Sequence, residues 1–428
     1  MSMDTLEDSV RLASVLGECE QVPLRFGTSG RRGLLRHISQ LEIAINVLAE
    51  LEFLQSLPVA QGGILRGDSF HFAHDLRPSS SRLSEDLPGR GELAQAVEWA
   101  IHQAGMIPVN MGQIPTPALA CYALSHRKAC IMVTGSHIPF DRNGYKTYTS
   151  RGELTKADEG PIGQYVAAVK TRLYAMSCAD SCFAANGQFK TGSRPLSAAQ
   201  ADAALAYQAR YLDGFGSKAL SGLSLLFYQH SAVGRDILVH ILSSLGAEVV
   251  TAGRSDSFVP IDTENMDRNR LTTLQALYDQ AAGERAFDAV VSTDGDSDRP
   301  LLLGVEPGTG RLHFINGDVL GMLTAEYLGA DAVVVPISCN DAIDRGTLRE
   351  RLEPKTRIGS PHVIAGMEAA LNRGKQRVCG FEANGGFLTG SVITRGEHTL
   401  AALPTRDAAL PLIAVLSAAR QAGVSVLE

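Results

Sequence analysis

Residues 91–112 read "GELAQAVEWAIHQAGMIPVNMG", and this stretch decides the class of fold. Its first part has apolar residues at helical spacing and ends at Gly105, as helices commonly do. The part from 106 to 112 is typical of a strand followed by a turn. The stretch 234–253, "GRDILVHILSSLGAEVVTAG", repeats the order, with two glycines seven residues apart in each copy. The equal spacing of the glycines could reflect an internal repeat or chance. The alternation of helix and strand predicts an α/β protein.

The bulk composition narrows the functional classes. With 428 residues the chain is too long for one ordinary core, so we expect several domains. The net charge of −7 excludes a global basic field that would attract nucleic acid. No apolar run approaches the roughly 20 residues of a membrane span, and the acidic N-terminus is not a signal peptide. Seven scattered cysteines predict reduced thiols and a cytoplasmic location.

Breaks in the pattern predict domain boundaries. Residues 150–160 are charged and turn-rich, residues 181–197 resemble a polar surface insertion, and residues 258–265 form another break. A long helical pattern near the C-terminus is interrupted by Pro411. The predicted domains are 1–155, 156–260 and 261–428.

The stretch "DAVVSTDGDSDRPLLLGV" (288–305) is the strongest chemical motif. Two apolar strands flank a tight loop with three carboxylates at alternate positions, which can converge on one hard cation. An EF-hand begins similarly, but its sixth and twelfth positions are Arg299 and Val305 here, in place of Gly and Glu. A solvated acidic turn is the structural alternative. The predicted metal ligands are Asp294, Asp296 and Asp298.

The stretch "RFGTSGRRG" (25–33) has the composition of an oxyanion site. Three glycines, two hydroxyl residues and three arginines lie within nine residues. Backbone N–H groups and guanidinium groups both favour phosphate. An exposed basic turn is the alternative. The candidate ligands here are Arg25, Thr28, Ser29 and Arg32.

The stretch "VTGSHIP" (133–139) places Ser136 and His137 after a buried strand, with Lys146 following. A serine hydrolase would have glycines on both sides of the nucleophile, in the pattern G-x-S-x-G, and these are missing. A serine that carries a phosphoryl group fits better, because a metal loop and an oxyanion site occur elsewhere in the chain. From this stretch alone, an ordinary turn stays open.

The stretch "VCGFEANGGFLTGS" (378–391) presents Glu382 and Asn384 among glycines. Their side chains can accept from and donate to vicinal hydroxyl groups, so a sugar is a plausible ligand. A glycine-rich hairpin without a ligand is the alternative.

Together, in this order, the four stretches resemble the α-D-phosphohexomutase family. "TGSHIP" resembles its phosphoserine loop T-A-S-H-N-P, "DGDSDR" its metal loop D-G-D-G-D-R, and "GFEANGG" its sugar loop G-E-x-S-G. The family's F-G-T-S-G-x-R-G is intact at 26–33, and "DLRPSS" (75–80) and "PTP" (115–117) also match. The resemblance covers residues 24–428. The departures within these motifs are Gly135, which would loosen the serine loop, Ile138, which removes a polar group near the site, and Ser297, which would constrain the metal loop.

The resemblance implies roles for the candidate residues. Ser136 would be the phosphoserine, and its phosphate with the three aspartates would hold Mg²⁺. Arg299 would steady the phosphoryl group, and Lys146 would transfer a proton. His137 and Arg32 complete the catalytic set, and Glu382, Asn384 and His362, with Arg25, Thr28 and Ser29, complete the substrate set.

The resemblance also implies a fold and an activity. We expect three successive similar α/β domains with mixed sheets around a central cleft, without the family's fourth, C-terminal phosphate-binding domain. The expected activity is phosphohexose mutase, most simply phosphomannomutase, with a hexose 1,6-bisphosphate as activator. The expected partner is a phosphorylated hexose substrate, with no nucleic acid and no membrane. Phosphoglucomutase, phosphoglucosamine mutase, a metal-dependent phosphatase and a non-catalytic sugar-phosphate-binding protein are the alternatives. The oligomeric state is not predicted.

Overall fold

The computed structural model describes residues 10–27, 29–283 and 285–428, and the chain divides into two compact units. The first unit contains Met1–Gln113, as far as it is described, and Tyr122–Asp202; the second contains Ile114–Cys121 and Ala203–Glu428. One of the boundaries between the units falls inside helix α5 (Thr116–Ser125), and the others follow Gln113 and Asp202. The three-domain boundaries stay a prediction.

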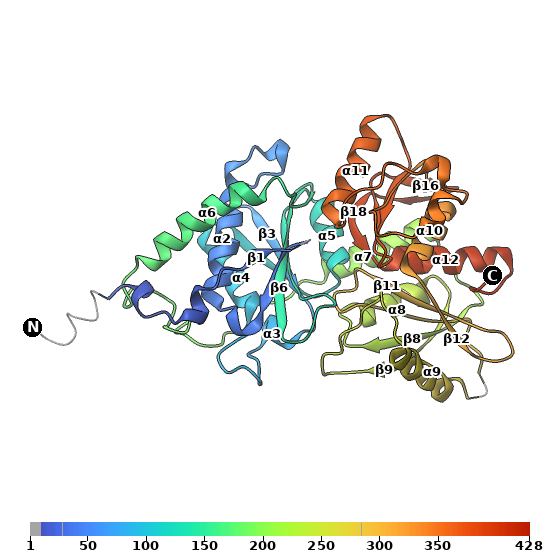
Figure 1. Ribbon diagram of the computed structural model, residues 1–428, viewed down its shortest axis with the longest axis horizontal. Helices are drawn as coiled ribbons and strands as arrows, with labels where there is room; N and C mark the ends of the chain where they lie inside the picture. The colour runs from blue at the N-terminus through green and yellow to red at the C-terminus, as the bar shows by residue number, and fades with distance from the viewer. Residues whose placement is uncertain (1–9, 28, 284) are drawn as a thin grey trace, which may run out of the picture. The chain divides into compact units, whose positions relative to one another are not determined.

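The first unit is built on a seven-stranded mixed sheet (Figure 1). Its strands are β1 (Arg25–Phe26), β2 (Arg31–Leu34), β3 (Ser69–His74), β4 (Ile107–Gln113), β5 (Cys130–Val133), β6 (Arg142–Thr149) and β7 (Gly152–Glu153). The order is β1–β2–β6–β5–β3–β4, and β7 pairs with β6 outside this path. Strand β3 runs parallel to β4 and β5, whereas the other neighbouring strands are antiparallel.

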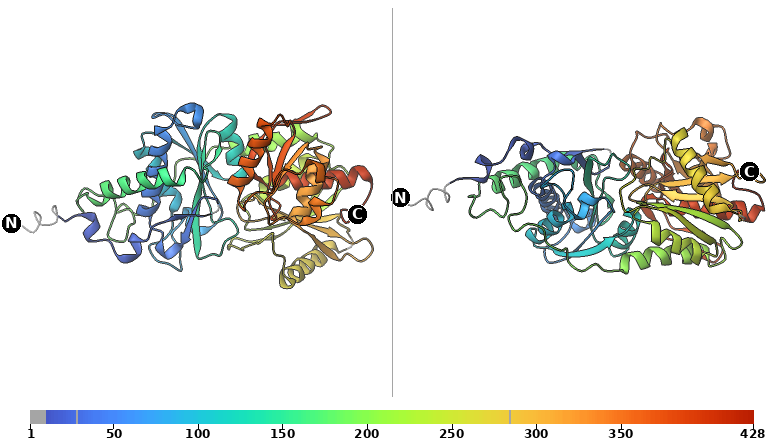
Figure 2. Two further views of the ribbon diagram at one scale, coloured as in Figure 1. Left: turned by 45° about the horizontal axis from the view of Figure 1, so that its top comes forward. Right: turned by 90° about the horizontal axis from the view of Figure 1, so that it is seen from below.

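The helices of the first unit are α2 (Gln40–Ser56), α3 (Pro78–Ser81), α4 (Leu93–Gln103) and α6 (Glu159–Tyr174). Helix α2 packs against both α4 and α6 (Figures 1 and 2), and its apolar residues are buried in the core. Ser39 caps α2, because its hydroxyl accepts from the amide of Glu42 at 3.2 Å. The helix and strand predicted over 91–112 are confirmed as α4 and β4.

The second unit contains a five-stranded sheet, a four-stranded sheet and a small hairpin. The strands of the first sheet, in spatial order, are β12 (Leu312–Ile315), β11 (Pro300–Val305), β10 (Ala289–Thr293), β8 (Ser224–His230) and β9 (Glu248–Arg254). Those of the second are β13 (Ala332–Val334), β14 (Val378–Phe381), β15 (Phe387–Thr389) and β18 (Leu403–Asp407). The hairpin consists of β16 (Ile393–Arg395) and β17 (His398–Leu400).

The helices of the second unit are α7 (Asp202–Phe215), α8 (Arg235–Ser244), α9 (Arg268–Ala282), α10 (Gly317–Tyr327), α11 (Ser360–Asn372) and α12 (Ala409–Ala422). In this unit α10 packs against α12 (Figure 1), and α11 packs against β13 and β14. The second helix–strand copy is confirmed as α8 and β9.

The spaced glycines have matching backbone conformations in the two copies. Gly105 and Gly246 follow their helices with φ of 71° and 97°. Gly112 and Gly253 lie within β4 and β9 with φ of 74° and 64°. Because a positive φ favours glycine, both positions have a local structural reason for glycine, and the internal repeat stays a prediction.

Two sequence expectations about the loops and helices are wrong. Helix α12 is continuous, because Pro411 lies in its first turn, where no backbone N–H is needed. The polar segment 181–197 is anchored in the core by Phe183 and Phe189, whose rings stack at 4.8 Å; Phe183 also lies edge-on to Trp99 at 5.2 Å. No helix within the described ranges has the length and apolar character needed to cross a membrane.

Candidate active site

The loop after β5 holds Ser136 in a left-handed backbone conformation, with φ of 53°. The hydroxyl of Thr134 accepts from the amide of Ser136 at 2.7 Å and donates to Asp75 Oδ2 at 2.7 Å. Asp75 also accepts from the amide of Gly135 at 3.3 Å. Ser136 is buried, and its Oγ lies 3.5 Å from Nδ1 of His137. The backbone around Ser136 is therefore fixed by buried polar groups.

The guanidinium group of Arg77 also holds this loop in place. It donates to the carbonyl oxygens of Ser136 (3.2 Å), Ile138 (2.8 Å), Pro139 (2.8 Å) and Arg142 (2.9 Å). A Cβ atom at Gly135 would lie 2.5 Å from Arg77 Nε. The glycine thus leaves room for the guanidinium group beside the loop, and its effect on the flexibility of the loop stays a prediction. Asp75 and Arg77 both belong to "DLRPSS".

In the first unit, Lys146 and the end of the predicted oxyanion stretch lie on neighbouring strands, because β2 pairs with β6. Lys146 lies on β6, is buried, and pairs with Met132 on β5. The amide of Thr134 donates to the carbonyl of Gly144 on β6 at 3.0 Å. Gly30, with φ of 74°, packs so closely on β6 that a Cβ there would lie 3.0 Å from Lys146 Cα.

The strand period separates the arginines of the oxyanion stretch. Arg31 faces the core, where its Nε lies 2.6 Å from Glu50 Oε1 and its guanidinium group lies 3.7 Å from the ring centre of Phe26. Arg31 therefore stabilises the core, and only the other two arginines of the stretch, Arg25 and Arg32, remain candidates for binding an oxyanion. The neighbouring Arg32 points to the opposite face of β2, since successive side chains alternate.

The other predicted ligands of this stretch have different environments. Ser29 is buried, and its hydroxyl donates to Glu153 at 3.2 Å. Arg25 lies exposed on β1. Thr28 lies outside the described residues.

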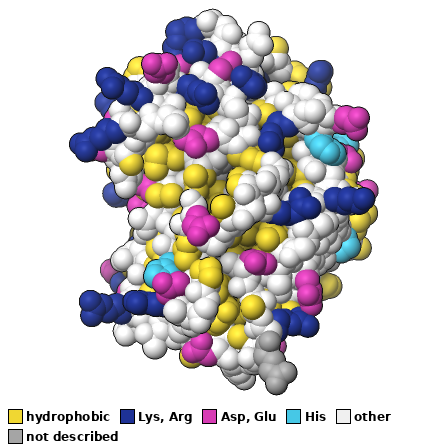
Figure 3. Space-filling view, turned by 90° about the vertical axis from the view of Figure 1, so that its right-hand side faces the viewer, with side chains coloured by type: hydrophobic (Ala, Val, Ile, Leu, Met, Phe, Trp, Pro, Cys, Tyr) yellow, Lys and Arg dark blue, Asp and Glu magenta, His cyan; other side chains and the backbone are white. Residues whose placement is uncertain are grey.

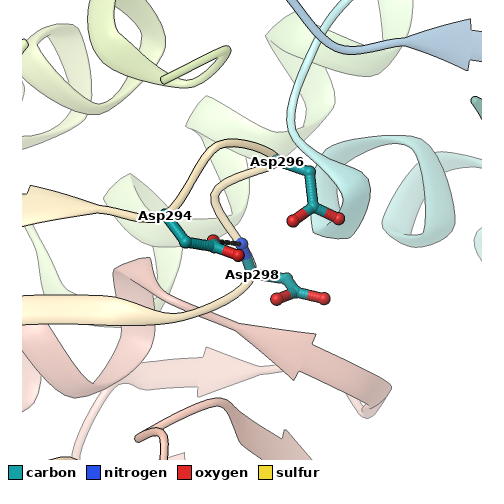
Figure 4. A group of neighbouring side chains, drawn as sticks. All are labelled: Asp294, Asp296 and Asp298. Carbon is teal, nitrogen blue, oxygen red and sulfur yellow. Dashed lines mark hydrogen bonds between the residues drawn. The ribbon is translucent and has the colours of Figure 1, made fainter. Parts of the chain in front are cut away.

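In the second unit, the loop between β10 and β11 carries the three aspartates (Figure 4). One carboxylate oxygen from each of Asp294, Asp296 and Asp298 lies within 4.8 Å of the other two, and all three residues are buried. Asp294 Oδ1 accepts from the amides of Asp298 (3.1 Å) and Arg299 (3.2 Å), which fixes the loop. Thr116 donates its hydroxyl to Asp296 Oδ2 at 2.6 Å.

These three carboxylates have the chemistry of a cation site. Buried like charges this close repel one another unless a cation neutralises them. A set made only of oxygen donors suits Mg²⁺. The residues therefore fit a bound divalent metal.

Ser297 adopts a left-handed conformation in the same loop, with φ of 58°. Its hydroxyl accepts from the amide of Gly234 at 3.0 Å and from the hydroxyl of Thr293 at 2.9 Å. These contacts offset the backbone cost of a side chain at this φ. The imidazole of His230 stays neutral, because burial lowers its pKa to about 4, and its Nε2 donates to the carbonyl of Thr293 at 2.8 Å.

The sugar-type loop between β14 and β15 is joined to the aspartate loop by a residue that the sequence analysis missed. Glu382 Oε2 accepts from Arg406 Nη1 at 2.9 Å, and Arg406 Nη2 lies 3.0 Å from Asp298 Oδ2. Arg299 Nε lies 3.6 Å from the other oxygen of Asp298. Asn384 Oδ1 accepts from the amide of Gly386 at 3.0 Å, which shapes the loop.

A further acidic residue, Glu264, shares this electrostatic environment. Burial raises the pKa of Glu264, Arg299 opposes that shift, and the nearby carboxylates of Glu382 and Asp318 reinforce it. His362 lies half-buried in the first turn of α11. Sequence signals for Thr116 and Arg77 existed in "PTP" and "DLRPSS", whereas Arg406 and Glu264 carried none.

Comparisons with known proteins identify the family of the chain. Residues 24–172 match the phosphoglucomutase/phosphomannomutase alpha/beta/alpha domain I, and residues 316–428 match domain III of the same family. A phosphomannomutase of Sinorhizobium fredii is 41% identical over 398 residues, which cover 93% of this chain and 76% of the relative. A phosphomannomutase of Salmonella muenchen is 39% identical over 94% of this chain and 74% of the relative.

More distant relatives carry another name. A phosphoglucosamine mutase of Sphingopyxis alaskensis is 27% identical over 88% of this chain and 77% of that protein. The crystal structure of a phosphoglucomutase/phosphomannomutase family protein from Burkholderia thailandensis superimposes with a TM-score of 0.65 at 18% identity, covering 96% of this chain and 79% of the other. That likeness extends to the fold.

Proposed function

This chain belongs to the phosphoglucomutase/phosphomannomutase family, and we propose that it interconverts mannose 6-phosphate and mannose 1-phosphate. The two relatives near 40% identity are both named phosphomannomutases and align over more than nine-tenths of the chain. The observation that carries the proposal is the buried serine loop, in which Asp75 and Arg77 fix the backbone on both sides of Ser136. Such rigid support suits a residue that must present a phosphoryl group in one orientation.

In the proposed reaction Ser136 carries the phosphoryl group. A free hydroxyl of the hexose monophosphate attacks the phosphorus atom; a new P–O bond forms and the bond to Ser136 Oγ breaks. The sugar becomes a 1,6-bisphosphate and the serine regains its hydroxyl. The bisphosphate then reorients, so that its other phosphate faces Ser136. The reverse step transfers that phosphate to Ser136. Lys146 Nζ, with His137 beside the serine, accepts and returns the hydroxyl proton.

The aspartate loop is proposed to offset charge during transfer. Asp294, Asp296 and Asp298, together with the serine phosphate, would hold Mg²⁺, which stabilises negative charge on the phosphoryl oxygens when bound. Arg299 would act on the same oxygens. Arg32 and the stretch from Arg25 to Ser29 would contact phosphate through guanidinium and backbone N–H groups.

Glu382 and Asn384, with His362, are proposed to contact the sugar hydroxyls. Mannose and glucose differ in the orientation of one hydroxyl, so hydrogen-bonding groups of this kind determine the preference. A hexose 1,6-bisphosphate is the proposed activator, because it phosphorylates a serine that has lost its phosphate.

A coupled assay tests the proposal. The 1-phosphates of mannose, glucose and glucosamine are supplied separately, each started with a catalytic amount of the matching 1,6-bisphosphate. We expect the highest kcat/KM with mannose 1-phosphate and a phosphate adduct on Ser136 in the intact mass. Ser136→Ala should lose both the adduct and the turnover while keeping the parent's melting temperature. Turnover near the parent rate in this variant would refute the role of Ser136.

A further inference from the structure

One arginine links the two functional loops of the second unit. Arg406 lies on β18 and is 4% exposed. Its Nε and Nη2 lie 3.1 and 3.0 Å from Asp298 Oδ2 in the aspartate loop. Its Nη1 lies 2.9 Å from Glu382 Oε2 in the loop between β14 and β15. The planar guanidinium group thus contacts both carboxylates at once, which a single ammonium group cannot reproduce.

The surroundings keep Arg406 in this position. A Cβ atom at Gly386 would lie 2.7 Å from Arg406 Cδ, so the side chain passes directly over that glycine. The next residue, Asp407, is buried, accepts from Tyr207 Oη at 2.6 Å and from the amide of Ala409 at 3.0 Å, and is also bonded by Tyr211. The strand therefore has little freedom to move its arginine away from the two loops.

We propose that Arg406 is a positioning residue that couples cation binding at the aspartate loop to the sugar-contacting Glu382; this rests on the proposed function. Its positive charge neutralises Asp298, which is also a proposed metal ligand. A divalent cation and the guanidinium group therefore compete for the charge of one carboxylate. A bound cation weakens the hold of Arg406 on Asp298 and leaves Glu382 as its main partner.

The coupling has a direction in each of two equilibria. Arg406 lowers the affinity of the aspartate loop for a cation, because like charges repel across a few ångströms. It raises the affinity for the sugar, because it fixes the rotamer of Glu382. Loss of the charge of Arg406 should consequently strengthen the binding of the cation and weaken the binding of the sugar. Simple loosening of the fold would weaken the binding of both.

Isothermal titration calorimetry tests this with Mg²⁺ alone and with mannose 1-phosphate alone. All variants carry Ser136→Ala, so no turnover occurs during the titrations. In Arg406→Gln we expect Mg²⁺ to bind about tenfold more tightly and mannose 1-phosphate to bind about tenfold more weakly, as for loss of a charge-assisted contact. Arg406→Lys keeps the charge, so the Mg²⁺ affinity should return to the parent value while the sugar-phosphate affinity stays low.

Arg285→Gln is the control for the loss of a positive charge in this unit, because Arg285 Nη1 lies 2.7 Å from Glu248 Oε1 in an ion pair outside both loops. It should leave the Mg²⁺ affinity and the sugar-phosphate affinity unchanged. If Arg406→Gln leaves the Mg²⁺ affinity unchanged or weakens it, the coupling is overturned. If the parent chain isomerises no sugar phosphate but its Mg²⁺ affinity responds to the charge at 406, the proposed function fails and the coupling stands.

Discussion

At the scale of single residues, two serines have backbone conformations that usually favour glycine. Ser136 and Ser297 have φ of 53° and 58°, a region that costs an ordinary side chain roughly 1–2 kcal/mol. Ser136 has its amide bonded to Thr134, and Ser297 has its hydroxyl bonded to the amide of Gly234. The cost is thus met by local hydrogen bonds in both functional loops, which is where backbone strain tends to concentrate.

Ser297→Ala separates the strain from the hydrogen bonds. Alanine keeps the cost of the positive φ but leaves the buried amide of Gly234 without its acceptor. We expect the free energy of unfolding to fall by about 1–3 kcal/mol in urea titrations. Ser297→Gly relieves the backbone cost and should lose less. The interpretation would be contradicted by a glycine variant that is less stable than the alanine variant.

At element scale, the serine loop depends on a segment more than fifty residues away. Asp75 and Arg77 follow β3, which pairs with β5, and so reach the loop that follows β5. The sheet register places these chain segments together, because parallel neighbours end at the same edge.

Arg77→Lys tests how far that loop depends on a fork of donors. The guanidinium group serves four carbonyl oxygens, whereas lysine offers one compact donor group. We expect the free energy of unfolding to fall by about 1–3 kcal/mol and Ser136 to be phosphorylated more slowly by the 1,6-bisphosphate, followed by intact mass. Arg172→Lys, at an exposed ion pair with Glu52 in the same unit, should change the stability by less than about 0.5 kcal/mol. Equal losses in the two variants would remove Arg77 from the support of the loop.

Local patterns explain which elements could be predicted. The strands on both sides of the aspartates are rich in apolar residues and fully buried, so β10, its loop and β11 follow from the sequence. The inward direction of Arg31 also follows from strand alternation, once β2 is recognised. The bond between Arg406 and Asp298 spans 108 residues, and neither neighbourhood carries a pattern that announces the pair. Contacts of that kind depend on sheet order, which periodicity does not encode.

At the scale of the whole molecule, charges of both signs are mixed on the one face that Figure 3 draws, whereas three carboxylates are buried together in the aspartate loop. On the face drawn in Figure 3, Lys and Arg side chains lie among Asp, Glu and apolar groups. The net charge of −7 attracts no anionic substrate by itself. Binding of a sugar phosphate therefore depends on local groups and on whatever neutralises the three buried aspartates.

Magnesium should accordingly stabilise the whole chain. A ligand that binds only the folded state raises its stability by mass action, about 2.7 kcal/mol when present at a hundred times its Kd. We expect the melting temperature of the parent to rise with Mg²⁺ and to return to its original value after EDTA.

Asp296→Asn keeps an oxygen that can accept from Thr116 but removes one repelling charge. Without metal it should therefore melt no lower than the parent, and with Mg²⁺ its melting temperature should not rise. Its rate should fall by about 10²-fold or more, as for the loss of one electrostatic group at a transition state. Asp279→Asn, on an exposed part of α9, should keep the Mg²⁺ response and the rate. An equal rise in melting temperature for the parent and Asp296→Asn would place the magnesium site elsewhere, and the repulsion among the buried carboxylates would then need another counter-charge.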